Sequence, residues 1–78
     1  MTSHDTALWT VTREGRRVSC LVRLTPYGFE IDIAHDGAVI LTRAFEHDTE
    51  ALAWAERKRE ARAAEGWIPV DLPPEPKV

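Results

Sequence analysis

Three histidines have the widest chemical scope of the residues in this chain, and each is followed directly by an aspartate. The pairs are His4-Asp5, His35-Asp36 and His47-Asp48. A metal site needs several such ligands at about 2 Å from one ion. His35 and His47 flank segment 38–45, which as a strand would hold them about 26 Å apart. We therefore expect turn and helix-cap roles for the aspartates, and neither a metal nor another cofactor.

The other candidates for catalysis are one thiol and one pair of carboxylates. A nucleophilic cysteine needs a neighbouring base and a lowered pKa. Cys20 lies in an apolar segment with no histidine predicted beside it, which favours a buried and inert thiol. Glu30 and Asp32 share one face of a predicted strand, but carboxylates without a cleft are ordinary surface charge. No set of nucleophile, base and oxyanion donor can be assembled, so we predict a protein that is not an enzyme.

The chain has one basic cluster, formed by Arg57, Lys58, Arg59 and Arg62. Such clusters can bind the phosphates of single-stranded nucleic acid. Glutamates alternate with these residues, as they do on a solvated helix face. The net charge of −3 also differs from the basic excess of nucleic-acid-binding domains. Nucleic-acid binding through this cluster is the alternative function that the sequence leaves open.

The length and composition restrict the protein class. A chain of 78 residues allows one domain with a small core, which buries roughly 60–65% of the surface of the unfolded chain. A single cysteine allows no disulfide within the chain and suits a reducing compartment. No segment resembles a signal peptide or a membrane span. We therefore expect a cytoplasmic protein that does not bind membranes.

Four short segments with alternating apolar residues precede one helical segment. The strands are predicted over residues 8–13, 17–24, 29–34 and 38–45, and the turns between them contain glycine or proline. The helix is predicted to begin with Asp48 as N-cap and to end before Gly66 in a left-handed conformation. This order predicts an α+β fold: a four-stranded antiparallel meander sheet with one C-terminal helix packed on one face (ββββα). Residues 1–7 are expected to be a flexible N-terminus, 8–68 the single domain, and 69–78 a Pro-rich extended tail.

Loop lengths and the apolar pattern predict the strand register. A loop at 25–28 places Leu24 opposite Phe29 and Cys20 opposite Ile33. A similar loop at 14–17 places Val11 opposite Cys20. A two-residue turn at Asp36-Gly37 would mix the two faces, so a three-residue loop with a bulge is predicted, with Ile33 opposite Val39.

This register sorts the strand residues onto two faces. The face expected to pack against the helix carries Trp9, Val11, Val18, Cys20, Val22, Leu24, Phe29, Ile31, Ile33, Val39 and Leu41. The opposite face carries Leu8, Leu21 and Ile40 among polar residues and alanines, with Arg23 and Glu30 paired across strands. Such apolar residues are either ordinary surface residues or a sheet-to-sheet dimer interface.

The helix is expected to pack through Leu52 and Ala55, helped by Ala51 or Trp54. Trp54 is the tryptophan expected to stay partly exposed and to contact a partner. The candidate interface residues are Leu8, Leu21, Ile40 and Trp54.

The motifs W-x-V-x-R, V-S-C-L-V, G-F-E-I-D-I and A-x-x-W-A, followed by G-W, carry a resemblance. Over residues 8–68 the chain resembles short uncharacterised bacterial proteins of ββββα type. Its element order is also similar to that of the Whirly and PUR repeats and of the C-terminal domain of a eukaryotic transcriptional coactivator. Those folds bind single strands through basic and aromatic side chains on an exposed sheet face. The face predicted here has one arginine, two carboxylates and no aromatic ring, so no binding residue carries over. We therefore predict a domain that acts by forming a homodimer or by binding another protein.

Overall fold

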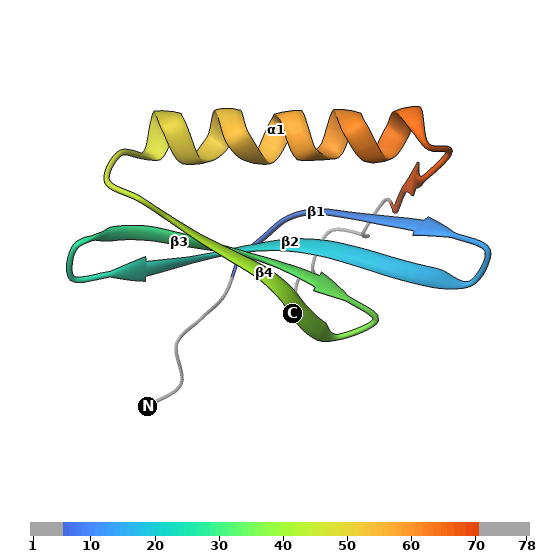
Figure 1. Cartoon of the computed structure of the whole chain (residues 1–78), viewed down its shortest axis with the longest axis horizontal. Coiled ribbons are helices and arrows are strands. Elements are labelled where there is room, and N and C mark those ends of the chain that lie inside the picture. The colour runs from blue at the N-terminus through green and yellow to red at the C-terminus, as the bar shows by residue number, and fades with distance from the viewer. Residues whose placement is uncertain (1–5, 71–78) are drawn as a thin grey trace, which may run out of the picture.

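The computed structural model describes residues 6–70, which form one sheet covered on one face by one helix (Figure 1). The elements are β1 (Thr6–Arg13), β2 (Arg16–Thr25), β3 (Gly28–His35), β4 (Ala38–Phe45), α1 (Asp48–Ala64) and β5 (Ile68–Pro69). The predicted α+β class, the meander and the C-terminal helix are confirmed. Part of the expected N-terminal segment and of the expected tail belongs to the sheet, because β1 begins at Thr6 and β5 includes Pro69. The rest of both segments, 1–5 and 71–78, lies outside the described residues.

The sheet has five strands in the order β4-β3-β2-β1-β5, and all pairs are antiparallel. The fifth strand was not predicted, because a proline-rich sequence favours extended chain without a ladder. Here Ile68 pairs with Thr12 and Pro69 with Val11. The N–H of Val70 also donates to the carbonyl oxygen of Thr10 over 2.8 Å. Proline is tolerated at this place because β5 is an edge strand.

The register is confirmed for β2–β3, where Leu24 lies opposite Phe29 and Cys20 opposite Ile33. It is wrong for β1–β2, where Val11 lies opposite Val18. The reason is a two-residue turn in which Glu14 and Gly15 both have positive φ, at 53° and 79°. Such turns match the right-handed twist of the flanking strands. The shift is two residues, so the faces do not change.

The β3–β4 hairpin also differs from the prediction. Its turn has two residues, Asp36 and Gly37, with φ of 51° and 90°. A bulge further along β4 then restores the apolar pattern, since Ile33 pairs with Leu41 and Ala34 with Val39. Ile40 is the extra residue of this bulge. Leu41 therefore stays on the helix side of the sheet, whereas Val39 moves to the outer side.

The ends of α1 explain its length. The N-cap residue is His47, with no side-chain cap hydrogen bond, so the predicted capping role of Asp48 is wrong. Asp48 still lies in the first turn, where a negative charge favours the helix dipole. At the other end Gly66 has φ of 96°, and the N–H of Trp67 donates to the carbonyl of Arg62 over 3.1 Å. This is the pattern of a Schellman cap, which confirms the predicted role of Gly66.

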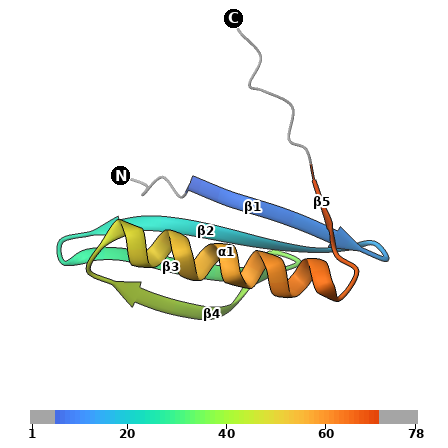
Figure 2. The same ribbon diagram turned by 90° about the horizontal axis from the view of Figure 1, so that it is seen from above.

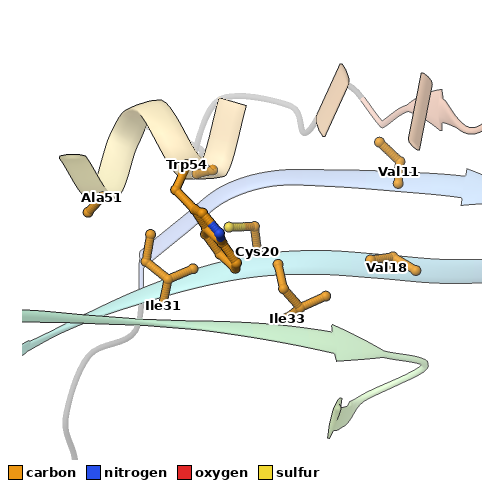
Figure 3. Packing of buried hydrophobic residues seen from close by; sticks show 8 residues of the cluster. Val11, Val18, Cys20, Ile31, Ile33, Ala51 and Trp54 are labelled. Carbon is orange, nitrogen blue, oxygen red and sulfur yellow. The ribbon is translucent and has the colours of Figure 1, made fainter. Parts of the chain in front are cut away.

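The core lies between the sheet and three helix residues, Ala51, Trp54 and Ala55 (Figure 3). The buried cluster comprises Val11, Val18, Cys20, Ile31, Ile33, Ala51, Trp54 and Ala55. Figure 3 shows Trp54 projecting from α1 toward Cys20, Ile31 and Ile33. The two alanines allow close approach of the helix, and the indole fills the remaining space.

The predicted packing face of the helix is therefore confirmed at Ala51 and Ala55 and wrong at Leu52, as is the expected exposure of Trp54. Trp54 is buried at 6% exposure, and the predicted anchor Leu52 is 51% exposed. The indole N–H of Trp9 donates to the carbonyl of Ala55 over 2.9 Å and fixes the helix above β1. Within residues 6–70, no helix is long and apolar enough to cross a membrane.

Candidate interaction surface

A polar cluster occupies one half of the outer sheet face. Asp32 accepts from Arg23 Nε over 3.0 Å and from the hydroxyl of Thr42 over 2.6 Å. Arg23 Nη2 also lies 2.8 Å from Glu30, which confirms the predicted cross-strand pair. The hydrogen bond from Arg23 holds the pKa of Asp32 below its usual range, with the hydroxyl of Thr42 and the charge of Arg23 acting in the same direction against burial. A carboxylate with such a pKa and such partners stabilises the sheet and is a poor general base.

Because of this cluster, we expect the stability of the fold to depend on pH. The folded-state pKa of Asp32 lies below its unfolded value of about 3.9. Its contribution to the free energy of unfolding is therefore complete above about pH 3.9 and is lost as the pH falls through the folded-state pKa. We expect Asp32→Asn to lower the free energy of unfolding by about 1–2 kcal/mol at pH 7 and by less at pH 2. Urea unfolding at both pH values measures this. An equal loss at both would contradict a role for the Asp32 charge.

Cys20 is placed as predicted, buried in the core as a free thiol. Burial raises the pKa of Cys20 to about 12, and the charge of Asp32 acts in the same direction.

The two histidines within residues 6–70 lie apart from each other. The ring centre of His35 lies 6.3 Å from that of Trp67 in an edge-on arrangement, and His47 precedes the helix. His4 lies outside the described residues. Among residues 6–70, no three His, Cys, Asp or Glu side chains are grouped so that they could hold a metal ion.

The basic cluster of the helix is largely engaged by its neighbours. Arg59 hydrogen-bonds Glu56 one turn earlier, and Arg62 lies 4.0 Å from Glu65. Two of its cations also lie over indole rings, Lys58 Nζ at 5.2 Å from the ring centre of Trp54 and Arg62 at 5.4 Å from that of Trp67. These contacts direct the cations toward this chain's own acids and aromatic rings.

The first half of β4 is an exposed apolar run. Val39, Ile40 and Leu41 are 55%, 58% and 43% exposed at consecutive positions. Figure 2 shows the reason: α1 runs over the middle of the sheet toward β1 and β5, and β4 lies at the margin. Phe45, at the other end of β4, is the part that packs against the helix, with its ring 5.6 Å from that of Trp54.

The outer face adds to this feature on the side away from the polar cluster. A hollow of about 760 Å³ lies there, and Ser19, Leu21, Ala34 and Val39 are among the residues that line it. Leu21 is half-buried and Ala34 is buried. The apolar part of this lining, Leu21, Ala34 and Val39, extends to β4, whereas Arg17, Ser19 and Asp36 make much of the rest of the lining polar.

The candidate interface residues separate into two groups. Leu21 lines the hollow of the outer face, and Ile40 belongs to the exposed run of β4. Leu8 and Trp54 belong to neither, which corrects the prediction. Leu8 lies at an irregularity between Ala7 and Trp9 that changes the alternation, so it packs against the core cluster, and Trp54 is itself part of the core.

Sequence reasoning missed Val39 and Leu41, because both were assigned to the core. Their exposure follows from the bulge and from the direction of α1, and neither has a clear sequence signal. Comparisons with models of protein families, with curated proteins and with solved structures find no match.

Proposed function

We propose that this chain is a small non-enzymatic binding domain that acts by self-association, with another protein as the alternative partner. The observation that carries the proposal is the run Val39–Leu41, three large apolar residues exposed at consecutive positions of the edge strand β4, with Leu41 on the helix side and Val39 on the outer side. Scattered exposed apolar residues are ordinary, but a contiguous group on a small domain indicates an interaction site. Burying these side chains against a second molecule would remove that area from water.

The chemistry of the described residues supports a binding role. Cys20 is buried with a raised pKa, and the Asp32 carboxylate is held by Arg23 and Thr42. A free, buried thiol also fits a reducing compartment, so we place the domain in the cytoplasm. Nucleic-acid binding through the helix has less support, because Lys58, Arg59 and Arg62 already contact groups of this chain.

The proposal is tested by the solution mass across a concentration series in sedimentation equilibrium. We expect a monomer–dimer equilibrium whose dissociation constant rises at least about tenfold in Ile40→Glu, because the new charge would be buried at the interface. Leu52→Glu is the matched control, since Leu52 is 51% exposed on the helix and away from β4. That variant should associate like the wild type. A wild-type protein that stays monomeric at several hundred micromolar would refute self-association.

A further inference from the structure

The free edge of β4 is complementary to itself, and we infer that it pairs antiparallel with β4 of a second copy about a two-fold axis at Thr42. The two sheets would then join into one. This inference rests on the proposed self-association and names the strand and register that would produce it. Three properties of the described residues support it.

The first property is the contrast between the two edges of the sheet. At one edge β1 is partly covered, because it pairs with Ile68–Pro69 and accepts a hydrogen bond from Val70. At the other edge β4 has no neighbour beyond β3 within residues 6–70. Stable monomers usually protect a free edge with lysine, proline, short length or a bulge. The sequence of β4, AVILTRAF, is eight residues long with Arg43 as its one charge.

The bulge at Ile40 and the charge of Arg43 are the protections that β4 carries, and the bulge leaves residues 41–45 in regular register with β3. The edge that follows the bulge can therefore accept a further strand.

The second property is the direction of the backbone groups. The N–H of Asp36 donates to the carbonyl of Arg17 over 2.7 Å, which fixes the alternation of hydrogen-bonded pairs along β2–β3. Counting back along β3, Asp32 and Ala34 direct their backbone groups toward β2, and Ile31 and Ile33 direct theirs toward β4. Ile31 pairs with Arg43 and Ile33 with Leu41. The N–H and C=O groups of Thr42 and Ala44 consequently point away from β3, toward the free edge.

The third property is charge, and it selects the axis. When two identical strands pair antiparallel, the residues that exchange hydrogen bonds must be those whose backbone N–H and C=O groups point away from β3. Three arrangements meet this condition: Thr42 opposite Thr42, Thr42 opposite Ala44, or Ala44 opposite Ala44. The second arrangement would set Arg43 directly opposite Arg43 of the other copy, and facing like charges destabilise a sheet. The third would carry the pairing into residues 46–47, beyond the end of β4.

The first arrangement avoids both faults and pairs residues 41–43 of the two copies in regular register, in the part of β4 that follows the bulge. Ile40 of one copy, the extra residue of the bulge, would lie beside Ala44 of the other, a large side chain next to a small one. Arg43 would lie opposite Leu41, which its aliphatic stem can cover. The exposed side chains of Ile40 and Leu41 would lie at the interface between the two copies.

The size of the interface between the two copies sets the expected affinity. One added strand buries less than the roughly 1,200 Å² of a stable interface, so the dimer should be weak, with a dissociation constant of about 1–100 µM.

The test uses a proline on the outward-pointing backbone of the full chain. Ala44→Pro removes an N–H that does not bond β3, so the fold should remain. The interface between the two copies, in contrast, would lose a hydrogen bond. We expect the dissociation constant to rise at least about tenfold, whereas Ala44→Ser, which keeps both the N–H and a small side chain, should associate like the wild type. A monomeric wild type would refute the self-association itself. A wild-type dimer that persists unchanged in a folded Ala44→Pro would refute only the edge pairing and would point to the outer face.

Disulfide formation tests the axis without proline. A Thr42→Cys residue at the axis faces its own copy at about 5.5 Å between Cα atoms, within reach of a disulfide. Ala44→Cys is displaced by four residues from its own copy, about 13 Å along the strands, and should not cross-link. The native Cys20 is buried and should stay reduced in both. If the Ala44→Cys variant cross-linked with a yield equal to or greater than that of Thr42→Cys, the proposed axis would be overturned.

Discussion

Replacing Trp54 with alanine is expected to lower the free energy of unfolding by about 3–5 kcal/mol, the usual cost of removing a large aromatic side chain from a core. Trp54 is 6% exposed and contacts Phe45, and the guanidinium of Arg43 lies 5.9 Å from its ring centre. The other buried helix residues are Ala51 and Ala55, so no larger side chain of α1 can fill the cavity. A domain of 78 residues has about 4–12 kcal/mol of stability in total. The variant should therefore be largely unfolded near its former melting temperature, as circular dichroism at 222 nm would show.

Two further helix variants make this prediction specific. Leu52→Ala removes an exposed apolar side chain from the same helix and should change the free energy of unfolding by about 0.5 kcal/mol or less. Trp54→Phe keeps an aromatic ring and should lose less than the alanine variant. If Leu52→Ala were the more damaging change, α1 would have to face the sheet with its other side.

Gly28→Ala is expected to cost about 3 kcal/mol or more, because two unfavourable effects act on the same atom. Gly28 has φ of 145°, a conformation that residues with a Cβ rarely adopt. An added Cβ would also lie 2.3 Å from the carbonyl oxygen of Phe45 and 3.1 Å from the Cα of Glu46. Both are backbone atoms at the end of β4, so no side-chain rotation can relieve the contact. Urea denaturation followed by tryptophan fluorescence measures the loss.

Gly15→Ala separates the two effects. Gly15 has φ of 79°, but nothing lies within 4 Å of the Cβ position. Its substitution should cost only the conformational strain, about 1–2 kcal/mol. Equal losses at Gly15 and Gly28 would mean that the contact with Phe45 is relaxed by movement of the backbone.

Much of this fold could be predicted, because its elements have strong local signals. Asp36-Gly37 and Gly66 mark a turn and a helix end through conformations that favour glycine or asparagine-like residues. Period-two alternation identified the four meander strands, and the predicted bounds of β4 agree with the structure. The β2–β3 register followed from the loop alone.

The candidate site was harder to predict, because it depends on irregularities. A bulge shifts the alternation by one residue, and at Ile40 this moved Val39 from the expected core to the outer face. The side of α1 that faces the sheet was also ambiguous, because its apolar stripe is weak and alanines surround it. Only packing against the sheet decides that Trp54 rather than Leu52 is buried.

The short strand β5 has a consequence for how far association could proceed. A sheet with two free edges can add copies without limit, which is how fibres grow. In this chain Pro69 lies in the strand that covers β1, and proline lacks the N–H that a further strand would need. Pairing through β4 about a two-fold axis uses the same edge of both copies. The partly covered edge then lies at each end of the joined sheet, which disfavours growth beyond two copies.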